Sequence, residues 1–239
     1  MENNKSIVID QGNTMSKIAT FIDSEIQDIK RVPNEDFNIS EVMSSGVPCI
    51  YSSVAENSNA GVKIVHEMGG IGFSYNTPIP VKINYHSPET LGLDRIANAC
   101  AVIKRYKFKN ALVIDAGSCV TYDLILDSTF VGGAISPGMS MRFRAMNNFT
   151  GGLPLATFEA KAEWPGDTTN SCLQVGVFSG LVSEMNGFID AAKLQSNNLE
   201  VVITGGESPH FARALKCSIF ADPNLTLKGL HEILLFNSK

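Results

Sequence analysis

The chain has 239 residues, 44% of them hydrophobic and 18% charged, so it is long enough for one large or two small globular domains and is not a disordered polypeptide. The net charge of −5 disfavours broad binding to the phosphate backbone of nucleic acids, and we expect no nucleic-acid partner. The five cysteines form no C-x-x-C pair and the four histidines lack metal-ligand spacing, which indicates reduced thiols and no zinc site. The sequence also has no membrane-span or signal-peptide pattern, so we expect a cytoplasmic protein.

The first half of the chain predicts three strands and one helix. Residues 6–10 are apolar at successive positions, which is typical of a strand buried on both faces, and residues 16–23 continue as its hairpin partner after a Gly-Asn-Thr turn. A short strand is expected at 49–54. From Asp94 onward, apolar residues recur at helical spacing. The predicted buried face of this helix consists of Ile96, Ala99, Cys100, Ile103 and Tyr106.

The second half predicts four strands and three helices. The strands are expected at 111–115, 121–126, 130–138 and 199–206. A long helix should run from Thr168 to about Leu194, a second should begin at about Pro209, and the closing GLHEILLF should form a short third one. The predicted buried stripe of the long helix consists of Leu173, Val177, Leu181, Met185, Phe188 and Ala192.

Each half opens with the same pattern, in which an apolar strand ends in an aspartate, turns on a glycine and continues as another strand. Asp10 ends the first such strand and Asp115 the second. A repeat of about half the chain predicts a pseudo-two-fold α/β fold with two similar lobes. We place the lobes at residues 1–109 and 110–239, with a hinge at the short polar segment 107–110.

These two turns carry the chemistry that nucleotide phosphates need. Backbone N–H groups beside Gly12 and Gly117 can hold phosphate oxygens, and the preceding carboxylates can hold Mg²⁺ or its water. Thr14 and Ser118 add hydroxyl groups, and Lys17 adds a positive charge. Two ordinary hairpins with Asx turns are the alternative, but two copies at matching places favour a nucleotide cleft between the lobes. Neither a P-loop nor a Rossmann glycine motif is present.

Four further stretches are informative. Asp94 and Arg95 lie near a predicted helix start, where Asp94 could act as a base and Arg95 could clamp a substrate carboxylate; the alternative is a helix-capping acid beside a surface arginine. Residues 132–138 hold too many glycines for a plain strand and suggest a backbone-lined pocket. The two glycines that end 203–206 would let an adenine ring lie against the backbone, unless they only form a strand-to-helix turn. The hydroxyls of 166–171 are typical of helix capping.

Taken together, these motifs resemble the type III pantothenate kinase family of the actin and sugar-kinase superfamily. The matching stretches are DQGNTMSK (10–17), GLDR (92–95), DAGSCVTYD (115–123), GGAISPG (132–138) and the pair Gly205-Gly206, in the family's order and over nearly the whole chain. The second phosphate motif departs from the family pattern, since Ser118 replaces a threonine and Cys119 an alanine. Ser118 keeps the hydroxyl group.

The resemblance implies two actin-like (ribonuclease H-like) lobes with a cleft between them, a cytoplasmic homodimer, and the reaction of ATP with pantothenate to give ADP and 4′-phosphopantothenate, the first step of coenzyme A synthesis. It implies that Mg²⁺ comes with ATP near Asp10, that Asp94 is the catalytic base, and that Asp115 helps to hold a monovalent cation, K⁺ or NH₄⁺. The implied ATP-binding residues are Asp10, Gln11, Gly12, Asn13, Thr14, Met15, Ser16, Lys17 and Ser118. The implied pantothenate-binding residues are Tyr85, Gly92, Leu93, Asp94, Arg95 and Thr169.

Two other functions remain open at this level. Another small-molecule kinase of the superfamily, acting on a sugar or a carboxylate, would share both phosphate turns but has no reason to carry the GLDR stretch. A regulatory protein on the same fold would bind a nucleotide without transferring a phosphoryl group, and the intact Asp94 and Lys17 argue against it. A turnover assay with pantothenate and ATP separates the three.

Overall fold

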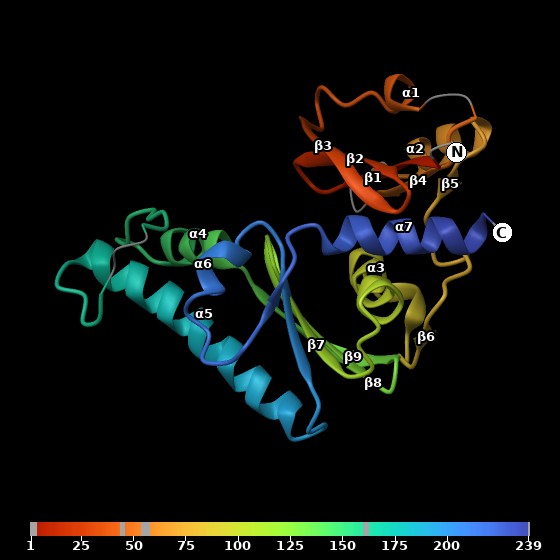
Figure 1. Ribbon diagram of the computed structural model, residues 1–239. Coiled ribbons are helices and arrows are strands. Elements are labelled where there is room, and N and C mark those ends of the chain that lie inside the picture. The colour runs from red at the N-terminus through yellow and green to blue at the C-terminus, as the bar shows by residue number, and fades with distance from the viewer. Residues whose placement is uncertain (1–3, 44–45, 54–57, 160–162, 239) are drawn as a thin grey trace. The chain divides into compact units, whose positions relative to one another are not determined.

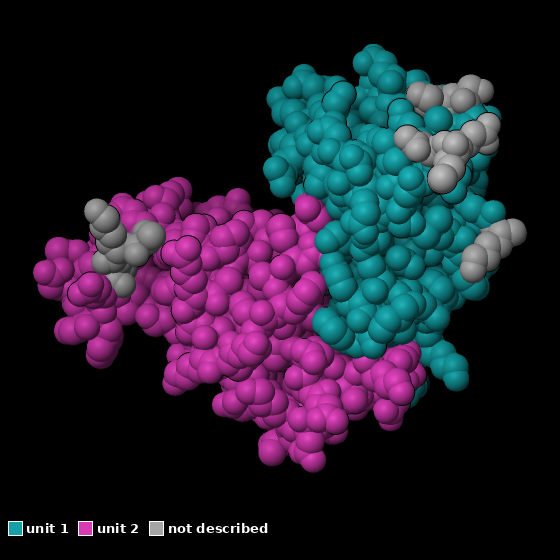
Figure 2. All heavy atoms as spheres, in the orientation of Figure 1, with its two compact units in different colours: residues 1–108, 225–239 teal, residues 109–224 magenta. Residues whose placement is uncertain are grey.

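The computed structural model describes residues 4–43, 46–53, 58–159 and 163–238 (Figure 1). The chain divides into two compact units, unit 1 with residues 1–108 and 225–239, and unit 2 with residues 109–224 (Figure 2). The predicted end of the C-terminal lobe, 110–239, therefore differs from that of unit 2. The last fifteen residues of the chain belong to unit 1, because the apolar C-terminal helix packs against elements of that unit.

Unit 1 is built on a five-stranded sheet in the order β3-β2-β1-β4-β5. The strands are β1 (Lys5–Gln11), β2 (Met15–Ile22), β3 (Glu25–Pro33), β4 (Cys49–Ser53) and β5 (Ile71–Gly72). β1 pairs antiparallel with β2 and parallel with β4, which confirms the predicted hairpin. Ile7, Val8 and Ile9 are all buried, as expected for a strand that is covered on both faces. Residue 54, the last of the predicted third strand, lies outside the described residues.

The remaining elements of unit 1 are mostly helical. They are α1 (Ile39–Val42), α2 (Ser58–Glu67), the two-residue strand β6 (Lys82–Ile83), the 3₁₀ turn η1 (Pro88–Thr90), α3 (Leu93–Cys100), the π-helical stretch η2 (Ala101–Arg105) and α7 (Leu225–Asn237). The helix predicted from Asp94 is confirmed, and its predicted apolar face is buried except for Tyr106, which is half-buried and follows η2. The predicted C-terminal helix is also confirmed but begins earlier. It is tied to unit 1 by the Thr226 hydroxyl, which donates to Asn98 Oδ1 at 2.9 Å, and by His231, which stacks on Phe21 of β2.

Helices α3 and α7 approach so closely that one position of α7 has no room for a side chain. A Cβ atom built on Gly229 would overlap the carbonyl oxygen of Ala97, which is backbone and cannot rotate away. The Gly229→Ala variant should therefore lose about 1–3 kcal/mol or more of unfolding free energy, as overpacked sites do. Chemical denaturation measures this loss. The matched control is Gly180→Ala, a helical glycine with open space around its Cβ, which should be neutral or stabilising; equal losses in both variants would contradict the close approach.

Unit 2 repeats the sheet of unit 1. Its strands are β7 (Ala111–Ala116), β8 (Cys119–Leu126), β9 (Thr129–Pro137), β10 (Glu200–Thr204) and β11 (Phe220–Ala221), in the order β11-β10-β7-β8-β9. β7 pairs antiparallel with β8 and parallel with β10, just as β1 pairs with β2 and β4. The predicted internal repeat is therefore confirmed, and it places Asp10 and Asp115 at corresponding ends of two corresponding strands.

The helices of unit 2 are α4 (Met139–Phe149), α5 (Thr169–Lys193) and α6 (Ser208–Phe211). The long helix is confirmed, and Thr168 and Ser171 form a capping box at its start. Its predicted stripe is buried in the core of the unit except for Phe188, which is only partly buried, while the adjacent Ile189 is fully buried. Among the helices of the described residues, none has both the length and the apolar character needed to cross a membrane.

Candidate active site

The first predicted phosphate turn lies between β1 and β2. The Gly12 N–H donates to the carbonyl oxygen of Met15 at 3.0 Å and closes the turn. Asn13, Thr14 and Met15 are exposed at its tip, so their backbone and the Thr14 hydroxyl are accessible to a ligand. This is the geometry expected of a loop that presents polar backbone groups to an anion.

Asn34, which follows β3, supports this turn and was not predicted. Its amide nitrogen donates to the carbonyl oxygen of Gly12 at 2.9 Å, its Oδ1 accepts from the Ser16 hydroxyl at 2.9 Å, and its own N–H donates to the carbonyl oxygen of Thr14 at 3.1 Å. Ser16 is fully buried, so its hydroxyl fixes the turn from the inside. An asparagine after a proline signals a local turn in sequence, but nothing in the sequence shows that it reaches back about twenty residues.

Gln11 is fixed in a similar way from the neighbouring strand. Its Oε1 accepts a hydrogen bond from the Tyr51 hydroxyl at 2.5 Å and another from the Ser53 hydroxyl at 3.1 Å, both from β4. With its oxygen engaged, the side chain of Gln11 is held in one orientation at the end of β1. Its amide nitrogen is then the group that can serve a ligand.

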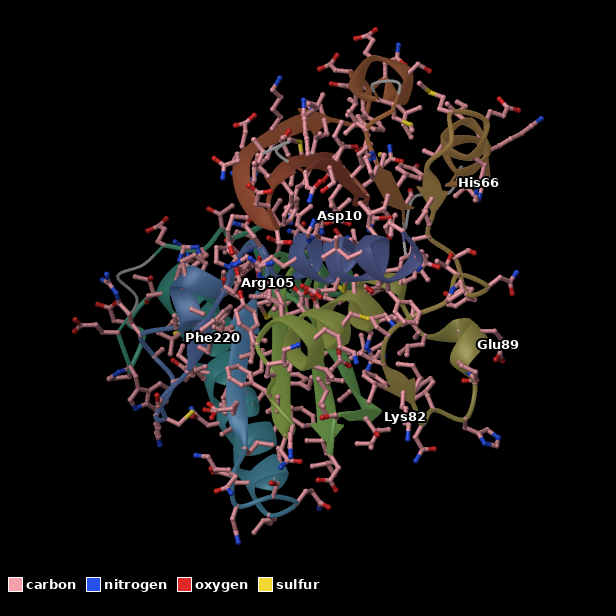
Figure 3. The ribbon with its side chains drawn as sticks, turned by 45° about the vertical axis from the view of Figure 1, so that its right-hand side comes forward. Asp10, His66, Lys82, Glu89, Arg105 and Phe220 are labelled. Carbon is pink, nitrogen blue, oxygen red and sulfur yellow. The ribbon has the colours of Figure 1, made fainter. Side chains whose placement is uncertain are left out.

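Asp10, Lys17 and Asp94 form the charged part of the site within unit 1. Asp10, which is labelled in Figure 3, lies on β1 directly opposite Lys17 on β2. Their Oδ2 and Nζ atoms are 4.0 Å apart. Burial raises the pKa of Asp10, the charge of Lys17 opposes that rise, and the nearby carboxylate of Asp94 adds to it. Two interacting carboxylates favour a divalent cation or a proton between them, so this group fits the Mg²⁺ that accompanies ATP.

Asp94 and Arg95 occupy the first turn of α3, whose N-cap is Gly92 and whose first residue is Leu93. Asp94 Oδ1 accepts a hydrogen bond from the Arg95 N–H at 2.8 Å, which fixes the carboxylate at the helix start. Arg95 is only 5% exposed, so the alternative of a surface arginine is wrong. A buried guanidinium is costly unless it meets anionic or acceptor groups, so its position is fixed more firmly than that of a surface arginine.

The other predicted pantothenate residues lie in different units. Tyr85 is half-buried in the segment that follows β6 of unit 1. Thr169 is exposed as the first residue of α5 in unit 2.

The second predicted phosphate turn lies between β7 and β8 and is tighter than the first. The Gly117 N–H donates to the carbonyl oxygen of Cys119 at 3.0 Å, and Ser118 is exposed at the tip. The carbonyl oxygen of Ser118 accepts from the Gly138 N–H at 3.1 Å, so the end of the predicted 132–138 stretch packs on this turn.

Asp115 lies just before that turn, half-buried beside the glycine pair that follows β10. A Cβ atom built on Gly205 would overlap the carbonyl oxygen of Ala116 and lie 2.5 Å from Asp115 Oδ1. A carboxylate oxygen and a carbonyl oxygen thus face the same bare glycine. Oxygen atoms of these two kinds suit a hard cation, so the residues present fit the predicted K⁺ or NH₄⁺.

Known proteins resemble the chain along its whole length. A model of the type III pantothenate kinase family matches residues 6–191. A type III pantothenate kinase of Phocaeicola vulgatus is 37% identical over 240 residues, covering 98% of this chain and 99% of that protein, and one of Christiangramia forsetii is 36% identical, covering 97% and 98%.

Solved structures show the same fold at lower identity. A Campylobacter jejuni protein described as a Baf family transcriptional activator is 23% identical with a TM-score of 0.69, covering 97% of this chain and 98% of its own. Component A of the Acidaminococcus fermentans (R)-2-hydroxyglutaryl-CoA dehydratase is 15% identical with a TM-score of 0.53, covering 97% and 96%. An Arthrobacter polyphosphate/ATP-glucomannokinase, 12% identical with the same TM-score, covers 98% and 100%. These likenesses confirm the predicted actin-like α/β fold.

Proposed function

Because this chain belongs to the type III pantothenate kinase family, it is a kinase that phosphorylates pantothenate with ATP in coenzyme A biosynthesis, and we propose that its two Asp–Gly turns hold the ATP. The observation that carries this assignment of the site is the repeated strand, aspartate, turn and strand in two sheets whose five corresponding strands follow the same order. Residues 10–15, Lys17 and Ser118 bind the phosphates, whereas the predicted Ser16 is buried and supports the turn through Asn34. Asp10 would hold the divalent ion that such a kinase uses with ATP, and the ion would neutralise phosphate charge.

Asp94 is the base in this proposal. The hydroxyl of pantothenate gives its proton to the Asp94 carboxylate while its oxygen attacks the γ-phosphorus; the bond from that phosphorus to the β,γ-bridging oxygen breaks, and ADP leaves. The position of Asp94 at a helix start, within electrostatic range of Asp10, supports this role. Arg95 binds the carboxylate of pantothenate, with Tyr85, Gly92, Leu93 and Thr169 completing the substrate site.

The decisive experiment is a turnover assay with purified protein, ATP and Mg²⁺. We expect ADP to form only when pantothenate is added, with one phosphorylated pantothenate per ADP detected by mass spectrometry. ADP formation with a sugar or another carboxylate instead would make the chain a different kinase of the superfamily. Tight nucleotide binding without transfer to any of these acceptors would support the regulatory alternative.

The proposed clamp predicts how a conservative substitution behaves. Lysine keeps the charge of Arg95 but cannot make paired hydrogen bonds to a carboxylate, so Arg95→Lys should raise the KM for pantothenate about tenfold or more and leave the KM for ATP nearly unchanged. Steady-state kinetics with each substrate varied in turn measures both constants. Arg144→Lys, at an exposed arginine of α4, is the matched control. Equal effects on both substrates would assign Arg95 a structural role.

We also propose that the protein is a cytoplasmic homodimer that needs a monovalent cation at Asp115. Large apolar side chains of unit 2 that a single chain leaves in contact with water support the dimer: Phe149 is 88% exposed, Trp164 84% and Leu155 58%. Light scattering should give twice the chain mass of 25.8 kDa, and a monomer at assay concentrations would rule the dimer out.

A further inference from the structure

Four polar side chains from four different elements meet in unit 2, outside the residues assigned to ATP or pantothenate. Glu184 of α5 accepts hydrogen bonds from the Tyr122 hydroxyl of β8 at 2.8 Å and from an Arg142 terminal nitrogen of α4 at 2.6 Å. The same nitrogen of Arg142 donates to the Ser136 hydroxyl of β9 at 2.7 Å. The group joins two strands to two helices.

Arg142 makes one more contact, which links this group to the backbone. Its Nε donates to the carbonyl oxygen of Pro137 at 2.8 Å. The guanidinium therefore holds two consecutive residues, Ser136 and Pro137, through two different nitrogen atoms. A planar guanidinium with several donors in fixed directions can do this, whereas a lysine ammonium cannot reproduce the arrangement.

The segment that Arg142 holds ends against the second phosphate turn. Gly138 follows Pro137 directly, and its N–H donates to the carbonyl oxygen of Ser118 at 3.1 Å. A Cβ atom on Gly138 would overlap the carbonyl oxygen of Gly117, so the two backbones touch without a side chain between them. Such a contact cannot be adjusted by rotating a side chain, and a shift of residues 136–138 must move the turn at Ser118.

The charge state of Glu184 suits a permanent clamp. Burial by itself would raise the pKa of Glu184, but hydrogen bonds from Arg142, Tyr122 and Ser136 and the charge of Arg142 outweigh burial and hold that pKa below its usual value. The carboxylate therefore stays ionised at neutral pH. Arg142 and Glu184 are each about three-quarters buried, so solvent screens their attraction less than that of a surface pair.

We propose that the Arg142–Glu184 pair positions the second phosphate turn for ATP. The inference rests on the proposed function in assigning Ser118 to the ATP phosphates. Arg142 and Glu184 do not contact the nucleotide; they are positioning residues that act through Ser136, Pro137 and Gly138. Their contribution is the placement of Ser118 before ATP arrives, so they should affect ATP binding far more than the binding of pantothenate.

Two single variants test the pair. Glu184→Gln keeps the shape of the side chain and removes its charge, and Arg142→Lys keeps the charge and loses the Nε contact to Pro137. Each should raise the KM for ATP and the calorimetric Kd for ATP about tenfold, the usual worth of a charge-assisted hydrogen bond, while the KM for pantothenate changes little. The double variant should bind ATP about as weakly as either single variant, because each single substitution already breaks the same clamp.

The matched control is an ion pair of similar length in unit 1. Arg105 lies 2.8 Å from Glu25, which pairs with Ile22 at the end of β2 opposite to the predicted phosphate turn before Met15. Glu25→Gln should leave both ATP constants at their wild-type values. Glu184→Gln and Arg142→Lys could instead lower the melting temperature and leave the affinity for ATP unchanged, like the affinity of Glu25→Gln. The pair would then have only a structural role, and the proposal would be overturned.

Direct binding separates this inference from the proposed function. The wild-type protein could fail to phosphorylate pantothenate but still bind ATP, with weaker binding in the two variants. That result would support the positioning role of the pair and contradict the assigned activity. If the wild-type protein is active and the variants bind ATP normally, the assigned activity is supported and the positioning role of the pair is contradicted. Should one variant fail to fold, as judged by circular dichroism, the other still decides the outcome.

Discussion

Replacement of Asp94 by asparagine should lower kcat by about 10²-fold or more. Asparagine has nearly the same size and can still accept the hydrogen bond from the Arg95 N–H, so the start of α3 should keep its structure. It cannot take a proton from the attacking hydroxyl, and the loss should match the usual worth of general acid–base catalysis. Asp94→Asn also removes one negative charge near Asp10. The affinity for the metal ion that accompanies ATP should fall for this reason, but by a smaller factor than kcat.

The measurement is a steady-state assay at saturating ATP and pantothenate, with the KM values determined separately. Glu89→Gln is the matched control, since Glu89 is an exposed acid in η1, five residues before Asp94 in the chain (Figure 3). It should retain wild-type kcat. An Asp94→Asn enzyme with nearly wild-type kcat and normal folding would remove Asp94 from the proton transfer and leave it as the N-terminal acid of a helix.

The sequence predicts the repeat well because its signals are local. In each half, a run of apolar residues, an aspartate and a glycine turn lie within about fifteen positions, so pattern alone finds β1, β2, β7 and β8. β3 was missed for a physical reason. It is an edge strand that is mostly open to water, and a register shift at Thr20 and Phe21 breaks its alternation, so it lacks the apolar pattern of a buried strand. Helix α4 buries only Met139 and Phe143 and gives a weak helical signal for the same reason.

Long-range contacts explain what the sequence could not provide. The chain returns to unit 1 at Leu225 because α7 fits against α3, and no local pattern tells which sheet a C-terminal helix will join. Asn34 and Arg142 are similar cases. Each is an ordinary polar residue in sequence, and each acquires a role only when the fold brings it to a phosphate turn or to the segment packed on one. The residues proposed to touch a ligand can thus be suggested by motif, whereas those that hold them in place require the structure.

The two aspartates of the repeat should hold different cations. Asp10 has Lys17 and Asp94 around it, a group suited to the divalent ion on ATP. Asp115 instead lies beside Gly205 and the carbonyl oxygen of Ala116, which also accepts the Glu207 N–H at 2.9 Å, so one carboxylate and one backbone oxygen offer a weaker field. Such a set suits a large monovalent ion better than Mg²⁺, which demands close octahedral coordination. The alternative is that Asp115 only stabilises its own turn through an Asx hydrogen bond.

A titration distinguishes these two roles. Wild-type activity should rise with added K⁺ or NH₄⁺ when tetramethylammonium keeps the ionic strength constant, because that bulky ion cannot enter an oxygen-lined site. Asp115→Asn removes the charge of the ligand, so half-maximal activation should need about tenfold more K⁺ or not be reached at all. Asp127→Asn, at an exposed acid in the turn between β8 and β9, is the control and should keep the wild-type response. If wild-type activity does not depend on K⁺ or NH₄⁺, Asp115 does not bind an activating cation. Asp115 would then be a turn residue whose carboxylate accepts a hydrogen bond from the backbone.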